Sequence, residues 1–138
     1  MILNQDLIRA RCQEIEESLD RLGRIKEKSK EEFLRDQDFQ DIACYRLLLA
    51  IEAALVLCYH VSAKHLKKVP EDYAGCFALL EEAGIIPADL SGSLQRMARF
   101  RNLLVRMYWK VDIEKLHDMI RQDLGDIRLF AGTIAKLL

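Results

Sequence analysis

Glycine and proline are scarce in this chain, with six Gly and two Pro among 138 residues. β-Sandwiches and barrels need a turn roughly every ten residues, so this scarcity argues against those folds. An excess of charge of one sign is also lacking, because 21 Lys and Arg oppose 22 Asp and Glu. The balance argues against disorder and against a global field that would attract nucleic acid. Any binding of RNA or DNA would therefore require a local basic patch.

Close cysteine pairs and long apolar runs are absent as well. Cys12, Cys44, Cys58 and Cys76 form no C-x-x-C pair, so they are interpreted as buried free thiols in a reducing cytosol rather than zinc ligands or disulfides. The longest apolar run, 47–59, is interrupted by Glu52, whereas a membrane span needs about 20 residues. The N-terminus contains no apolar signal segment. We expect a soluble cytoplasmic protein with no membrane partner.

Apolar residues recur at helical spacing through most of the chain, and no segment alternates as a strand does. Five principal helices are expected, at about 8–25, 39–66, 72–83, 87–109 and 112–134. Residues 28–38 are expected to form a charged connection with room for one short helical turn. Asp72 and Asp112 are the expected N-caps, and Gly84 is the expected C-terminal stop. Length and pattern together predict a single domain, 1–138, with an all-α helical-bundle fold.

The second expected helix is apolar on nearly every face between residues 47 and 59. A peripheral amphipathic helix would have one polar face, so this helix is either the centre of the bundle or packs on both its own domain and a second subunit. Its apolar surface exceeds what one small bundle can cover. We therefore predict a homodimer in which the fourth helices of the two subunits approach each other.

The fourth expected helix contains the most informative pattern. Met97, Phe100, Leu104, Met107 and Val111 recur at helical spacing and are predicted to form its buried stripe. Five basic side chains lie between positions 96 and 110, with two aromatic residues at 108 and 109. This patch is either a solvated helix face or a phosphate-binding surface, in which arginine donates two hydrogen bonds and the aromatic rings stack on bases.

The segment FRNLLVRMYWKVD resembles the signature R-N-x-x-x-H-x-Y of the HepT family, which belongs to the HEPN superfamily of all-α RNA-acting domains. Arg101, Asn102 and Tyr108 match this signature at the right spacing. The segments ACYRLLLAIEAALVLCYHVSAKHL and EDYAGCFALLEEAGII resemble the family's long second helix and its short third helix, so the resemblance covers nearly the whole chain. It implies a HEPN-like dimer that cleaves RNA without a metal or other cofactor.

The resemblance also implies a partner. HepT proteins are toxins of two-gene toxin–antitoxin systems, and their antitoxin is a minimal nucleotidyltransferase (MNT) that attaches AMP to the motif tyrosine. Here that residue is Tyr108, which is expected to be accessible to solvent and to line the same cleft as Arg101. AMPylation would add negative charge where RNA should bind.

One position departs from the family pattern, because Arg106 replaces the motif His. An imidazole suits proton transfer because its pKa lies near neutrality, whereas a guanidinium stays charged. Arg106 is therefore expected to hold phosphate without moving a proton, leaving a ribonuclease by descent that is inactive or weakened. Positions 101 and 106 lie about 140° apart on a straight helix. The helix is thus expected to end or bend near Val105, unless the two residues meet from different subunits.

Glu52 is the clearest supporting candidate, because an unpaired carboxylate inside an apolar run is unfavourable. A pairing with Arg101 or Arg46 is the structural interpretation, and support of the active cleft is the functional one. His60 falls where family members often have His, which gives it a candidate role in lining the cleft. His60 and His65 do not share a helical face and have no third ligand nearby, so no metal site is predicted.

Two alternatives remain beside the toxin hypothesis. The helical domain is either a non-catalytic scaffold or binding partner of a nucleotidyltransferase, which Arg106 favours, or a bundle whose only activity is dimerisation. The retained Arg101, Asn102 and Tyr108 favour the ribonuclease. His117 lies among charged residues and is expected to be solvated.

Overall fold

The computed structural model describes residues 3–138, apart from the side chain of Tyr108. The described residues contain seven α-helices and no strand, which confirms the all-α prediction. The helices are α1 (Gln5–Lys26), α2 (Lys30–Arg35), α3 (Gln37–Val61), α4 (Tyr73–Glu82), α5 (Ala88–Arg106), α6 (Ile113–Gln122) and α7 (Leu124–Ala135). A π-helical turn, Ser62–Leu66, extends α3, and a 3₁₀ turn, Tyr108–Lys110, follows α5.

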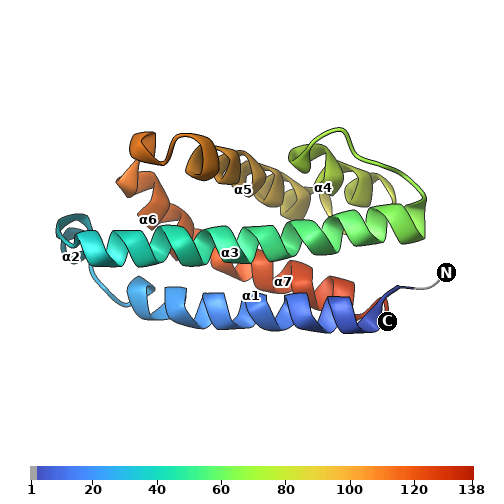
Figure 1. Cartoon of the computed structure of the whole chain (residues 1–138), viewed down its shortest axis with the longest axis horizontal. Helices are drawn as coiled ribbons and strands as arrows, with labels where there is room; N and C mark the ends of the chain where they lie inside the picture. The colour runs from blue at the N-terminus through green and yellow to red at the C-terminus, as the bar shows by residue number, and fades with distance from the viewer. Residues whose placement is uncertain (1–2) are drawn as a thin grey trace.

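Helix α3 is the centre of the bundle and contacts every other α-helix. Helices α1 and α7 lie along one side of it, and α4 and α5 lie along the other (Figure 1). Leu47, Leu57, Cys58 and Val61 of α3 are fully buried between these two layers. The all-round apolar character of this helix therefore follows from its having neighbours on both sides.

Helix α3 and the π-helical turn after it form a 30-residue apolar stretch, Gln37–Leu66, which by length and composition alone is sufficient to span a bilayer. Half of its most apolar window is buried inside the bundle, which is typical of a core helix. One face remains uncovered, because Ile42 is 45% exposed and Tyr45 58% exposed.

Local capping explains where several helices begin. The Asp72 carboxylate accepts a hydrogen bond from Gly75 N, and the Asp112 carboxylate accepts from Glu114 N and Lys115 N. Each cap satisfies a backbone donor that the first helical turn leaves without a partner. Gly84 follows α4 with a φ of 76°, a left-handed conformation that glycine adopts without steric strain. The expected caps at Asp72 and Asp112 and the stop at Gly84 are therefore confirmed.

The expected connection at 28–38 contains the short helix α2, capped by Ser29 and anchored by the buried Phe33. One expected helix differs in the structure. The last expected helix is two helices, because the backbone turns at Asp123 between α6 and α7. The hydrophobic spacing continues across this turn, so the periodicity alone could not reveal the break.

The predicted stripe of the fourth helix is correct only up to Leu104. Met97, Phe100 and Leu104 are buried, but α5 ends at Arg106 and Met107 is 39% exposed. The helix therefore ends one residue after Val105, whereas the sequence left open either an end or bend near Val105 or a meeting of Arg101 and Arg106 from different subunits. Beyond that point helical spacing no longer determines which side chains face the core.

The expectation for His117 was wrong, because its side chain is buried beneath α2. Its ring lies 5.1 Å from the ring of Phe33, centroid to centroid. Burial is the main cause that lowers the pKa of His117, and the nearby Arg121 also lowers it. The neighbouring charged residues on α6 point elsewhere, while position 117 faces inward on the same stripe as Leu116 and Ile120.

Candidate active site

Arg101 is held by three different neighbours near the C-terminal end of α5. Its Nε donates to a carboxylate oxygen of Glu52 on α3. The Arg101 side chain is mostly buried in this pair, with 15% of its surface exposed. Its Cζ lies 4.6 Å from the ring centroid of Tyr73, at the start of α4. Its Nη1 also donates to Asn102 Oδ1 over 3.2 Å. Three helices therefore fix the guanidinium in one orientation.

The pairing of Glu52 with Arg101 is one of the two that the sequence suggested. It explains how a carboxylate is tolerated within an apolar helix, because Glu52 lies on the uncovered face of α3 and keeps 40% of its side chain exposed. The other candidate partner, Arg46, lines a separate groove that Glu52 also borders. Glu52 thus lies at the boundary between the Arg101 cluster and the groove between α1 and α3.

A pocket of about 340 Å³ adjoins this cluster and is lined by Tyr59, Glu71, Asp72, Tyr73, Asn102 and Arg106. The rings of Tyr59 and Tyr73 meet edge to face, with centroids 5.9 Å apart and planes at 83°. Asn102 and Arg106 are four residues apart and so reach the pocket from one face of α5. We call this feature the tyrosine pocket.

Burial, aided by the neighbouring Cys76, raises the pKa of Tyr59, so its hydroxyl stays protonated at neutral pH. Cys58 and Cys76 are fully buried, and burial raises the pKa of the Cys58 thiol. All four cysteines are free in the structure, as predicted, although Cys12 and Cys44 are only half-buried. Inert thiols of this kind contribute packing and no nucleophile.

Arg101 and Arg106 both lie in the last turns of α5. Met107 N still donates to Leu103 O over 2.9 Å, and Met107 then leaves the helix with a φ of −142°. Arg106 is exposed and lines the tyrosine pocket, while Arg101 stacks on Tyr73, which lines the same pocket. Tyr73 is therefore the side chain that both motif arginines approach.

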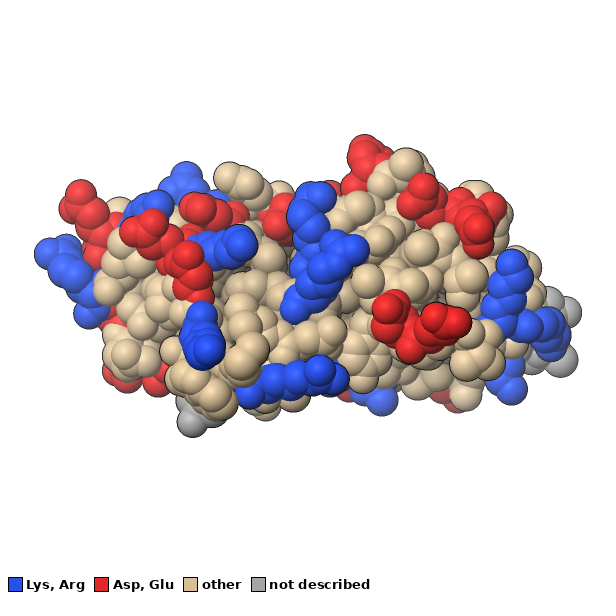
Figure 2. Space-filling view, turned by 90° about the horizontal axis from the view of Figure 1, so that it is seen from above, with Lys and Arg blue, Asp and Glu red and all other residues tan. Residues whose placement is uncertain are grey.

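Other basic residues of α5 border a different hollow. A pocket of about 520 Å³ between α5 and α6 is lined by the basic residues Arg96, Arg99 and Lys115 and by the apolar residues Phe100 and Met119. Viewed from the α4–α5 side, basic groups gather near the middle of the face and acidic groups lie on both sides (Figure 2). The local basic patch expected from the sequence is thus spread along the exposed side of α5.

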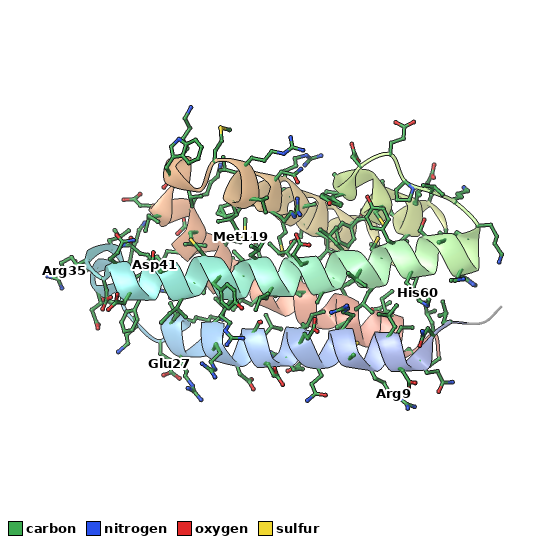
Figure 3. The ribbon with its side chains drawn as sticks, in the orientation of Figure 1. Arg9, Glu27, Arg35, Asp41, His60 and Met119 are labelled. Carbon is green, nitrogen blue, oxygen red and sulfur yellow. The ribbon has the colours of Figure 1, made fainter. Side chains whose placement is uncertain are left out.

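Of the other predicted site residues, His60 lies away from the tyrosine pocket. His60 is drawn between α3 and α1 (Figure 3), where its Nε2 accepts a hydrogen bond from Asn4 N over 2.9 Å. Its neighbour Tyr59, and not His60, lines the tyrosine pocket. The side chain of Tyr108 lies outside the described part of the structure, which places only its backbone, in the 3₁₀ turn after α5.

The sequence pattern did not identify Tyr59, Tyr73 or Glu71 as site residues. Tyr59 lies seven residues after Glu52, and thus on the same side of α3. Tyr73 is the first residue of α4, directly after its cap. The first of these positions was recognisable from helical spacing, whereas the second depends on how α4 packs against α5. Among the described residues, no group of three His, Cys, Asp or Glu side chains is placed to hold a metal ion.

Comparisons with known proteins agree on one family. The family model described as Ribonuclease HepT-like matches residues 15–134. The mRNA nuclease HepT of Shewanella oneidensis is 24% identical over 103 residues, which are 75% of this chain and 77% of that protein.

Solved structures show the same fold. The tri-AMPylated HEPN toxin of Shewanella oneidensis, in complex with the MNT antitoxin, matches with a TM-score of 0.85 and 22% identity over 94% of this chain and 96% of that chain. The cytosolic protein YutE of Bacillus subtilis, of unknown function, matches with a TM-score of 0.84 and 15% identity over 99% and 91%. The prediction of a HEPN-like fold is confirmed.

Proposed function

The chain belongs to the HepT-like ribonuclease family, and on this basis we propose that it is the toxin subunit of a cytoplasmic HEPN–MNT toxin–antitoxin pair. The observation that carries the proposal is the meeting of Arg101, Asn102 and Arg106 around Tyr73 at the end of α5. The relatives described as an mRNA nuclease and as a HEPN toxin with its MNT antitoxin support it. The proposed substrate is RNA, and the chain descends from a family of endoribonucleases.

Each residue has a distinct role in this proposal. Arg101, fixed by Glu52 and Tyr73, presents its remaining donors to a phosphate oxygen, and Asn102 holds the guanidinium from the side. Arg106 adds positive charge to the same phosphate. A guanidinium cannot accept the proton of the ribose 2′-hydroxyl or protonate the leaving oxygen, so turnover is lost or strongly weakened while RNA binding is retained.

The proposal includes a homodimer. Tyr45 of the uncovered face of α3 lines a hollow with Leu104 and Trp109 at and after the end of α5. Ile42 of α3 and Val105 and Met107 at the end of α5 are also exposed. Apolar surface of this kind next to a site supports burial against a second copy. In that dimer the two α5 helices approach each other and the two sites share one cleft. Light scattering at micromolar concentration should give twice the chain mass of 16.0 kDa; a stable monomer would contradict it.

The proposal also includes regulation by the antitoxin. The cognate MNT transfers AMP to Tyr108, which stands two residues beyond Arg106 in the 3₁₀ turn that follows α5. Adenylate groups there introduce negative charge and bulk beside the motif arginines, which opposes RNA binding. Incubation with MNT and ATP should add one or more AMP masses, and Tyr108→Phe should abolish the shift. Persistence of the shift in that variant would show that another residue is modified.

A second function is favoured by Arg106 itself. A chain without the motif imidazole fits a non-catalytic helical partner or scaffold of a nucleotidyltransferase equally well. The two functions differ in one respect, because only the first predicts that restoring the imidazole restores cleavage.

An RNA-cleavage assay of Arg106→His beside the unaltered chain tests this difference. General acid–base catalysis contributes about 10²–10⁴-fold, so the variant should cleave at least about 10²-fold faster. Arg99→His is the matched control, because it makes the same change on the exposed side of α5 outside the motif. Adding Arg101→Ala to Arg106→His should abolish the gain. Equal cleavage by Arg106→His and Arg99→His would refute the proposal.

A further inference from the structure

The tyrosine pocket carries two acidic side chains, which a phosphate-binding cleft would not need. Glu71 and Asp72, which precede α4, line it together with Asn102 and Arg106 of α5, and both acidic residues are exposed. Asp72 is occupied as the cap of α4, because its Oδ1 accepts from Gly75 N over 2.6 Å. Glu71 forms no ion pair in the described structure. The carboxylate of Glu71 is therefore the acceptor that a ligand in this pocket would meet.

The donors of the pocket come from α5. Asn102 Oδ1 accepts from Arg101 Nη1, so the amide Nδ2 of Asn102 remains as a donor beside the guanidinium of Arg106. Donors from α5 and a carboxylate from the segment before α4 therefore form a mixed lining. Such a lining disfavours a phosphate, which the carboxylates repel, and suits a neutral planar group with both donors and acceptors on its edge.

The aromatic walls indicate the same class of ligand. Tyr59 and Tyr73 are half-buried and stand perpendicular to each other, and the Arg101 guanidinium covers one face of Tyr73 and so fixes that ring. Rings held in this way offer a stacking surface without loss of side-chain entropy on binding. A volume of about 340 Å³ lies within the range of small-ligand pockets.

Resting on the proposed function, we infer that the tyrosine pocket receives one base of the RNA and prefers a base with an exocyclic amino group. The ring stacks against the tyrosines, the amino group donates to the carboxylate of Glu71, and Asn102 and Arg106 donate to the ring's acceptors. A carboxylate accepts well from the amino group of cytosine, whereas uracil has a carbonyl at the same position. The phosphate next to this base lies at Arg101 and Arg106.

Cytosine and uracil make a matched pair of probes because their rings have the same size and differ at that amino group. The affinities of labelled oligocytidine and oligouridine of equal length are measured by fluorescence anisotropy on the full chain. We expect oligocytidine to bind about fivefold more tightly. Glu71→Gln should remove the preference, because the amide can turn its NH₂ group towards uracil's carbonyl. Glu82→Gln, an exposed change at the other end of α4, should leave it unaltered.

A second pair of variants tests the stacking wall. Tyr59→Leu should weaken the binding of both oligomers about fivefold or more, while Tyr59→Phe, which keeps the ring, should bind as the unaltered chain does. Circular dichroism verifies that each variant is folded. Equal binding of the two oligomers, or a preference that survives Glu71→Gln, would overturn the base pocket alone. Failure of both oligomers to bind would overturn the proposed RNA-binding function as well.

Discussion

Removing the charge of Glu52 gives the most direct test of how the site is assembled. Glu52→Gln keeps the shape of the side chain and one acceptor oxygen but removes the ionic partner of Arg101. A hydrogen bond to a charged group contributes about 1.5–3 kcal/mol to stability. Because 40% of the Glu52 side chain is exposed, solvent screens part of this contribution. We therefore expect the free energy of unfolding to fall by about 1–2 kcal/mol.

Urea denaturation followed by circular dichroism measures this change. With an m-value of roughly 2 kcal/mol/M, the midpoint should fall by about 0.5–1 M. Glu14→Gln is the matched control, because Glu14 pairs with Arg11 one turn away on the same helix, where the two side chains are 49% and 35% exposed. A pair of that kind contributes well under about 1 kcal/mol.

A double-mutant cycle separates the ion pair from other effects. Once Glu52→Gln is present, Arg101→Gln should destabilise the protein less than it does alone, with a coupling energy of about 1 kcal/mol. If Glu52→Gln lowers the midpoint no more than Glu14→Gln, or if the two changes are additive, then Glu52 does not hold Arg101. In that case the stack on Tyr73 and the hydrogen bond to Asn102 would have to position the guanidinium.

Three further predictions concern stability. Because folding lowers the pKa of His117, the unfolded state binds more protons than the folded state as pH falls through 6.5. The free energy of unfolding should therefore decline from pH 7 to pH 5, and this decline should be smaller in His117→Gln. Identical pH profiles of the two proteins would contradict this. Lys67 adopts a φ of 57°, a left-handed conformation that glycine tolerates better than lysine. Lys67→Gly should therefore raise the free energy of unfolding by about 0.5–1 kcal/mol. The neighbouring Lys68→Gly should lower it in the same urea titration. Phe33→Ala should destabilise the protein by about 3–5 kcal/mol, since Phe33 is fully buried beneath α2 and next to His117; a loss below about 1 kcal/mol would mean that α2 packs only loosely.

The sequence predicted best those features that depend on a few neighbouring residues. The cap at Asp72 and the stop at Gly84 each act within one helical turn, so residue type and position were sufficient. The angle between positions 101 and 106 on a straight helix indicated either a helix end or bend near Val105 or a site shared between subunits, and α5 ends at Arg106. The unfavourable burial of a lone carboxylate indicated that Glu52 has a basic partner, either Arg101 or Arg46, and the structure shows that the partner is Arg101.

Features that depend on contacts between helices were less predictable. The break at Asp123 leaves the hydrophobic period intact, so α6 and α7 resembled one helix. His60 is adjacent to Tyr59, yet one side chain contacts α1 and the other lines the tyrosine pocket. A step of one residue turns a side chain by about 100°, and only the positions of the neighbouring helices decide which of two polar residues reaches a site.

The sequence by itself determined the helical fold class, most helix ends and the motif at the end of α5, because periodicity, capping and spacing are encoded within a turn or two of the chain. Tertiary structure alone decided that His117 is buried against Phe33 and that Tyr73 stacks on Arg101. Both outcomes join residues far apart in the chain, and such contacts depend on how whole helices fill the space around α3. Local sequence signals do not specify contacts between residues so far apart in the chain, whereas the close packing of the helices does.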